Sequence, residues 1–331
     1  MQKYGFQNDK QRYKCYGCLC TFQAGKRVSS KVLWEEYLLG KQTYDQLAKK
    51  YKCSRRTIQR KLDEHLVLIS EVKEPSSVVV LMDSTYWGRG FGVMLFKDAL
   101  SGKNLLKYYI KTESNTLYKK GILELQKNGF EVLAIVCDGR RGLLNSFGNI
   151  PVQMCQFRQA AIVRRYITKS PKMPASIELK SIVDLLAKTD KDSFEGLLAA
   201  WFAKWKTFLD ERTINEETGK SHYTHKRLRS AYRSLKANTP WLWTWYDNPA
   251  LQIPNTTNAI DGHFAHLKNK LRNHNELSLE RKKKFIPYYN QLKSKRKKHQ
   301  LFCPLEKNEP KLPTILSITP LIIILYLVWK L

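Results

Sequence analysis

The sequence predicts a mixed α/β domain whose sheet is interrupted by a large all-helical insertion, and three observations lead to this prediction. Short runs of β-branched residues alternate with turn signals between residues 77 and 137. A long stretch at about residues 170–250 then has helical periodicity and no clear strand run. The chain has 331 residues, which is more than one hydrophobic core usually serves, so we also expect smaller modules beside the main domain.

Three antiparallel strands are expected to open the sheet. Val78–Met82 is a short apolar run that we expect to be a buried strand ending at Asp83. Phe91–Phe96 and Leu105–Ile110 are two further strand-like runs, and the turn chemistry around Gly102 joins them as a hairpin. The domain is therefore expected to begin near residue 77 and to extend to about residue 290.

A helix and a parallel strand follow this hairpin. Asn115–Asn128 has helical periodicity, and Glu131–Cys137 runs apolar into Asp138. A strand, helix, strand connection returns a parallel strand beside the first. Three strands, then a helix, then a parallel strand is the order of elements in a ribonuclease H-like domain. We therefore predict a ribonuclease H-like sheet. Val152–Phe157 is expected to add a strand, and Ala160–Thr168 a basic helix.

Residues 29–72 are predicted to form a helix-turn-helix DNA-binding domain. Two short amphipathic segments, Thr43–Ala48 and Cys53–Leu62, flank a tight turn, and Ser54 is placed to cap the second. The residues expected to approach DNA are Arg55, Arg56, Gln59 and Arg60, and those expected in the core are Leu47, Ala48, Ile58 and Leu62. An ordinary helical hairpin with a solvated basic face is the alternative, and the net charge favours DNA binding.

Residues 1–28 are interpreted as a partial zinc-ribbon-like segment. Cys15 and Cys18 form a CxxC turn, as in one knuckle of a zinc ribbon, and could be half of a Zn²⁺ site. Only 14 residues precede Cys15, so we expect the first knuckle to be missing. A buried pair of thiols without metal is an equally open interpretation.

The charge of the chain points to a polyanionic partner. Lysine and arginine number 58 against 29 acidic residues, which gives a net charge of +29. Seven cysteines without regular spacing, and no cleavable apolar leader, favour a reducing cytoplasm. Residues 291–331 form a basic and then apolar tail whose run Leu321–Trp329 is too short to span a membrane, so no membrane partner is expected.

Three aspartates, far apart in the sequence, are the candidate catalytic residues. Asp83 and Asp138 each follow an apolar strand, and adjacent parallel strands would bring them together. Either aspartate alone would be read as a turn former or helix cap, but the paired placement favours a site. Asp261 lies in the first two turns of a capped helix that starts near Asn255. Three such carboxylates can hold the two divalent ions used to cleave phosphodiesters.

The helix that carries Asp261 is expected to divide its faces between core and DNA. Phe264, Leu267 and Leu271 are spaced to pack on the sheet. Lys268 and Arg272 would project beside Asp261 toward metal and DNA.

These residues resemble the bacterial insertion-sequence transposases related to the eukaryotic Mutator elements, in a variant class with an N-terminal zinc-binding segment. The most specific stretch is Asn255-Thr-Thr-Asn-Ala-Ile-Asp261, continuing through Leu271-Arg-Asn-His274 to Leu277-Ser278, which looks like the third catalytic motif of that family. The likeness spans roughly residues 1–286. It implies that Asp83, Asp138 and Asp261 bind Mg²⁺ or Mn²⁺ for DNA cleavage and strand transfer.

The same resemblance implies the partners and the location of the chain. The partners would be double-stranded DNA, namely the terminal inverted repeats of an insertion sequence and the target DNA. Paired element ends lead us to expect a homodimer on DNA. The location would be the bacterial cytoplasm, in association with the nucleoid.

Two residues depart from the pattern of this family. The third acidic position is generally glutamate, whereas this chain has Asp261, and the residue three positions after the cysteine is usually histidine, whereas Arg158 follows Cys155 here. These departures motivate an alternative function, a catalytically inactive, transposase-derived DNA-binding regulator.

Overall fold

The computed structural model divides the chain into two units, Met1–Gln291 and Leu292–Leu331, and describes only residues of the first. The described residues are 1–7, 10–23, 29–38, 40, 42–65, 75–272 and 277–287. The predicted tail at residues 291–331, with its apolar run, lies outside them. Within the described part, no helix is long and apolar enough to cross a membrane.

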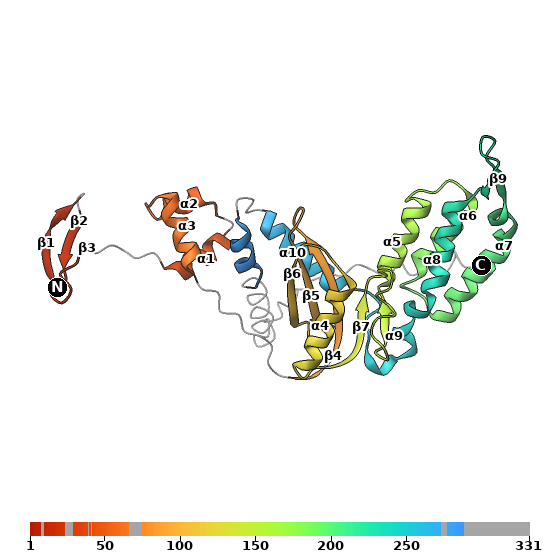
Figure 1. The fold of residues 1–331 in the computed structure, drawn as a ribbon, viewed down its shortest axis with the longest axis horizontal. Coiled ribbons are helices and arrows are strands. Elements are labelled where there is room, and N and C mark those ends of the chain that lie inside the picture. The colour runs from red at the N-terminus through yellow and green to blue at the C-terminus, as the bar shows by residue number, and fades with distance from the viewer. Residues whose placement is uncertain are drawn as a thin grey trace, which may run out of the picture. The chain divides into compact units, whose positions relative to one another are not determined.

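The described residues contain a mixed five-stranded sheet with the strand order β6-β5-β4-β7-β8. Figure 1 labels four of these strands, β4, β5, β6 and β7. The strands of the sheet are β4 (Ser77–Tyr86), β5 (Gly92–Asp98), β6 (Asn104–Ile110), β7 (Glu131–Cys137) and β8 (Val152–Met154). β4, β5 and β6 pair antiparallel, whereas β4, β7 and β8 pair parallel. The predicted mixed α/β class is confirmed, and so is the order of three antiparallel strands followed by a parallel one.

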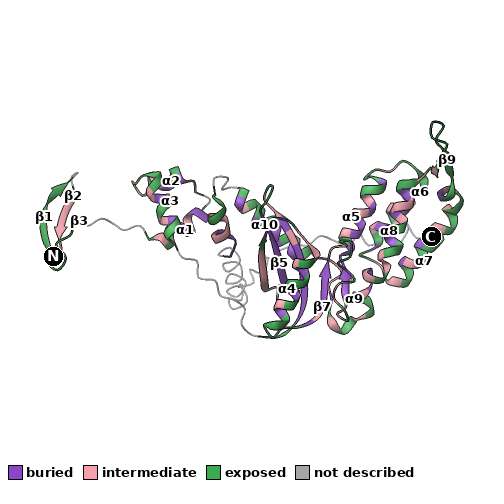
Figure 2. Ribbon diagram, viewed as in Figure 1, coloured by how far each residue is buried: buried purple, intermediate pink, exposed green. Residues whose placement is uncertain are grey.

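Each face of the sheet is covered by a different helix, and strand alternation decides which residues each helix meets. On one face, Val80 and Met82 pack in a core with Tyr118 and Ile122 of α4 (Asn115–Lys127). On the other face, the core contains the intervening residues Val79, Leu81, Ala134 and Val136, together with Ile260 and Phe264 of α10 (Asn258–Arg272). Figure 2 shows how fully the central strands are buried.

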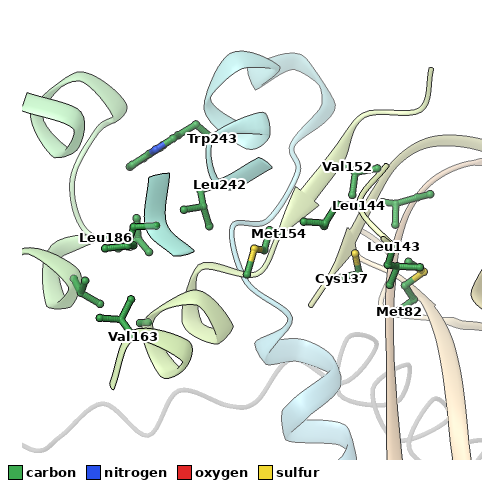
Figure 3. Close-up of a cluster of buried hydrophobic side chains, with 14 of the residues drawn as sticks. Met82, Cys137, Leu143, Leu144, Val152, Met154, Val163, Leu186, Leu242 and Trp243 are labelled. Atoms are coloured by element: carbon green, nitrogen blue, oxygen red, sulfur yellow. The ribbon is translucent and has the colours of Figure 1, made fainter. Parts of the chain in front are cut away.

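The helical insertion continues the first of these cores beyond β8. It consists of α6 (Pro174–Leu185), α7 (Lys191–Asp210), α8 (Lys226–Leu242) and α9 (Thr244–Asp247), followed by the short 3-10 turn Pro249–Leu251. α5 (Gln156–Ile167) precedes the insertion and follows β8 directly. Met154 lies between sheet side chains such as Cys137 and helix side chains such as Val163 of α5 and Leu242 of α8 (Figure 3). Sheet and insertion therefore share one apolar core, which fixes α5 relative to β7 and β8.

Several predicted boundaries were wrong, and each has a physical cause. β4 continues to Tyr86 instead of ending at Asp83, because β5 keeps pairing with it as far as Tyr86 and Gly92. β8 ends at Met154 because Cys155 is already the N-cap of α5. The insertion also contains a hairpin, β9 (Arg212–Ile214) and β10 (Ser221–Tyr223), which was missed because strands of three residues carry almost no periodic signal.

The N-terminal elements form two small structures. β1 (Gln2–Gln7), β2 (Lys10–Lys14) and β3 (Thr21–Gln23) make an antiparallel sheet. The others are α1 (Ser30–Leu38), α2 (Tyr44–Lys50) and α3 (Arg55–Glu64). Ser54 caps α3 by accepting a hydrogen bond from the backbone N–H of Thr57, as predicted. Leu47 of α2 is fully buried, as are Ile58 and Leu62 of α3, whereas Ala48 is half-buried.

Gly121 of α4 provides a test of this packing. A Cβ atom at Gly121 would come within 2.1 Å of the Phe96 ring, so the helix lies against the sheet only because this position has no side chain. We expect Gly121→Ala to lower the free energy of unfolding by about 1–3 kcal/mol through overpacking. Gly196→Ala in α7 is the matched control, since nothing lies within 4 Å of its Cβ. It should raise stability by up to about 1 kcal/mol, because alanine favours helix more than glycine does. Denaturant titration measures both changes, and equal effects would contradict the account.

Candidate functional site

The register of two strands brings Asp83 and Asp138 together. Parallel pairing of β4 with β7 ends at Leu81 and Val136, and each aspartate lies two residues further along its strand direction. Within β4 two residues is one full strand alternation, so Asp83 is on the face of Leu81, which α10 covers. Asp138 directly follows Cys137, the last residue of β7, and its charge acts on Asp83. Asp83 is nearly buried, and the backbone N–H of Ser84 donates to its Oδ1 at 2.7 Å.

Asp261 reaches the same face from the first turn of α10. The backbone N–H groups of Ile260 and Asp261 donate to the carbonyl oxygen of Thr257, and the Thr257 hydroxyl donates to Asp261 Oδ2 at 3.2 Å. Ile260 and Phe264 pack into the core against the sheet. The apolar side of the helix is therefore anchored, and its polar side presents Asp261 at the edge of the buried strands.

Arg158 connects two of the three predicted carboxylates. Its Nη2 atom donates to Asp83 Oδ2 at 2.9 Å and to Asp261 Oδ1 at 3.0 Å. Because both oxygens contact one nitrogen, they can be no farther apart than the sum of these two distances. Two residues separated by 178 positions in the sequence thus share one cation.

A buried cysteine fixes the starts of the two helices that carry these groups. The backbone N–H of Thr257 donates to Cys155 Sγ at 3.3 Å, and the Thr257 hydroxyl oxygen lies 3.3 Å from the same sulfur. The N–H of Gln156 donates to the Asn255 carbonyl at 3.0 Å. The N–H of Cys155 in turn donates to the carbonyl of Cys137 at 2.8 Å. β7, α5 and the approach to α10 are therefore joined at one point. Thr257 was not among the predicted site residues, and a threonine before a helix is only an ordinary capping signal.

Burial controls the charge of the strand carboxylates. Desolvation, and then the neighbouring charge of Asp138, raise the pKa of Asp83 to about 7, although Arg158 acts in the opposite direction. Burial also raises the pKa of Asp138, with Arg158 again opposing the shift. Perturbed carboxylates of this kind are characteristic of functional sites, although structural ion networks produce them too.

Glu113 is a fourth acidic residue close to this site, and it was not among the predicted site residues. Its charge contributes to the raised pKa of Asp138. The hydroxyl of Tyr118 donates to Glu113 Oε1 at 2.6 Å, and Arg140 Nη1 lies 3.5 Å from Oε2. Glu113 lies between β6 and α4 outside any strand, so no periodic pattern marks it.

The donor set suits a hard cation, but its arrangement is built around Arg158. Carboxylate oxygens are the ligands that Mg²⁺ and Mn²⁺ prefer. Asp83 and Asp261 already accept a positively charged group between them. Among the described residues, no group of three or more His, Cys, Asp or Glu side chains is placed to hold a metal ion. The two carboxylates therefore fit a cation, and a divalent ion could use the same oxygens only after Arg158 moves away.

All of the predicted DNA-binding residues except Gln59 are exposed. Lys268 and Arg272 follow Asp261 along the exposed side of α10. Arg55, Arg56 and Arg60 are exposed on α3, whereas Gln59 is half-buried. Arg55 lies 3.7 Å from Asp45 across the turn.

The thiols at the N-terminus are not buried as a pair. Cys15 is half-buried and Cys18 is exposed, which contradicts the buried-thiol interpretation. The backbone N–H groups of Cys18 and Gly17 hydrogen-bond to Cys15 and lower the pKa of its thiol. This arrangement favours the thiolate form that binds metals.

Comparisons with known proteins leave the family open. No protein-family model matches the sequence, and no curated protein matches it. One solved structure that resembles the chain is described as the simian T-cell lymphotropic virus intasome in complex with PP2A regulatory subunit B56 gamma. The two chains are 9% identical, the match covers 63% of this chain and 66% of the other, and the TM-score is 0.21. A likeness this weak carries no argument about fold or function.

The raised pKa of Asp83 leads to a prediction about pH. A carboxyl whose folded pKa is about 7, against an ordinary value of 3.8, stabilises the fold below pH 4 and loses that contribution as pH rises through 7. We compare the free energies of unfolding of Asp83→Asn and the wild type in metal-free buffer. The value for Asp83→Asn minus that for the wild type should rise by on the order of 4 kcal/mol as the pH increases from 4 to 7.5. Denaturant titrations across this range measure the gain, with the exposed Asp192→Asn as control. A difference between Asp83→Asn and wild type that stays constant with pH would show that Asp83 does not titrate near 7.

Proposed function

We propose that this chain is a DNA transposase of the Mutator-related insertion-sequence type, which cleaves DNA and transfers strands at Asp83, Asp138 and Asp261. The observation that carries the proposal is the meeting of Asp83 and Asp261 at one cation, beside the strand position of Asp138. The order β6-β5-β4-β7-β8 agrees with a ribonuclease H-like core, in which acidic residues gather at the central strands. The proposal thus joins the sequence resemblance to a site whose members come from three distant segments.

The residues of the site have separate tasks in this proposal. Asp83, Asp138 and Asp261 would hold Mg²⁺ or Mn²⁺. When bound, the metal activates the attacking oxygen and stabilises the leaving oxygen of the phosphodiester. Thr257 orients the Asp261 carboxylate through its hydroxyl. Lys268 and Arg272 offer positive charge to DNA phosphates along the same helix.

Recognition of element ends is assigned to α3. This helix follows a tight turn after α2, is capped by Ser54, and carries Arg55, Arg56 and Arg60 on its exposed side. The N-terminal residues of a recognition helix contact base edges in helix-turn-helix proteins, which suits Arg55 and Arg56 in the first turn of α3 and Gln59 at the start of the second. The DNA partners would be the terminal inverted repeats and the target, bound by a homodimer in the bacterial cytoplasm.

The N-terminal sheet is proposed to hold half of a Zn²⁺ site. Cys15 and Cys18 lie in the turn between β2 and β3, and the lowered pKa of the Cys15 thiol suits metal binding. Two further ligands would be needed to complete a tetrahedral site.

A second candidate function is a catalytically inactive DNA-binding regulator descended from such an enzyme. The contact of Arg158 with both Asp83 and Asp261 favours it, because the guanidinium takes the place where the carboxylates would bind metal. The two candidates share the DNA-binding assignment of α3 and differ only in chemistry.

Strand-transfer assays distinguish the two candidates. Duplexes selected from a random library for tight binding would serve as substrates, with Mg²⁺ or Mn²⁺ present. We expect the wild type to cut and join these duplexes. Asp83→Asn and Asp138→Asn should each lose activity on the order of a thousandfold, which corresponds to several kcal/mol of transition-state stabilisation. Binding in a gel-shift assay should survive both changes, and Asp192→Asn is the matched control.

The outcomes of this assay are distinct. Full activity in either Asp→Asn variant would overturn the catalytic assignment. Tight binding by an inactive wild type, with activity gained in Asp261→Glu, would support the regulator as a damaged enzyme.

A further inference from the structure

Arg158 contacts the carboxylate site and is itself partly exposed to solvent. It belongs to the first turn of α5, whose start is fixed by the hydrogen bonds of Cys155. The Arg158 side chain is 36% exposed and that of Asp261 35%, whereas that of Asp83 is 6% exposed. The guanidinium therefore contacts both the buried carboxylate of Asp83 and the more exposed carboxylate of Asp261.

The Arg158 guanidinium makes fewer hydrogen bonds than a structural arginine usually makes. Its Nη2 atom donates to the two carboxylates. Its Nε atom is buried and has no hydrogen-bond partner in the part of the chain that the structure describes. Buried donors are normally satisfied, and arginines that lock a fold use several of their five donors. Moving Arg158 outward would break two hydrogen bonds and would release one unsatisfied donor to water.

Charge explains why a cation is needed at this position. Asp83, Asp138 and Asp261 act electrostatically on one another and on Arg158. Ionised carboxylates in a partly desolvated site repel each other unless a positive charge lies between them. Arg158 supplies that charge with no bound ion, and a divalent cation would supply it at the same two oxygens. The arginine and the metal therefore compete.

We propose that Arg158 is a positioning residue that holds Asp83 and Asp261 together in the metal-free protein and must leave before a divalent cation binds them. This inference rests on the proposed function, because it concerns regulation of the same site. Arg158 would stabilise the free protein and weaken its affinity for metal. The site would then fill only where metal, or metal together with a DNA phosphate, outcompetes the guanidinium.

Mn²⁺ binding to the full chain tests the proposal without relying on catalysis. Free Mn²⁺ is followed by electron paramagnetic resonance, and the melting temperature is measured with and without Mn²⁺. We expect Arg158→Gln to bind Mn²⁺ at least about tenfold more tightly than the wild type, since one positive charge near 3 Å is removed. We also expect it to melt at a lower temperature without metal and to recover when Mn²⁺ is added.

Two control variants isolate the charge at this position. Arg158→Lys keeps the positive charge and should bind Mn²⁺ about as weakly as the wild type. Arg165→Gln removes a charge from the exposed side of the same helix and should leave both measurements unchanged.

The remaining outcomes contradict the proposal in different ways. If the wild type and Arg158→Gln bind Mn²⁺ equally tightly, or if Arg158→Lys binds as tightly as Arg158→Gln, the arginine does not compete with metal, while the proposed metal site stands. An Arg158→Gln protein that stays unfolded even with Mn²⁺ would show that metal cannot replace the arginine. If no variant binds Mn²⁺ at millimolar concentration, the proposed function fails as well.

Discussion

The site depends on one electrostatic constraint, which is that carboxylates placed in the middle of a sheet need a positive charge beside them. Asp83 is buried in β4 next to the position of Asp138, and burial alone disfavours its charged form. Arg158 meets this need from α5, and Asp261 joins the same contact from α10. Arg158 thus links three elements that are distant in the sequence.

The apolar packing around the site explains why these groups meet at all. Because side chains alternate along a strand, one set of strand residues packs against α4, and the other set, which continues to Asp83 in β4, packs against α10. Cys155 then joins β7, α5 and the approach to α10 through short hydrogen bonds to Cys137 and Thr257. Packing and hydrogen bonding therefore determine the distances over which the charges act, and the polar site is a consequence of the two-sided core.

Local patterns were sufficient to predict much of the sheet and to select Asp83 and Asp261, which the structure brings together. The boundaries of β7 and the start of α4 at Asn115 were predicted correctly, because a continuous apolar run and a capped amphipathic helix are local signals. The extension of β4 to Tyr86 was missed because it depends on pairing with β5. The sequence marks Arg158 only as a departure from the family pattern and does not mark Glu113, because their roles arise from contacts between segments far apart in the sequence.

Crystals of the protein with selected end DNA and Mn²⁺ provide the most direct test of the shared carboxylate site. Anomalous scattering from manganese locates the ion independently of any assay of activity. The account predicts a manganese peak in contact with Asp83 and Asp261, with the Arg158 side chain turned away from both. A map without manganese at these oxygens, in which Arg158 still bridges the two carboxylates while DNA is bound, would contradict it.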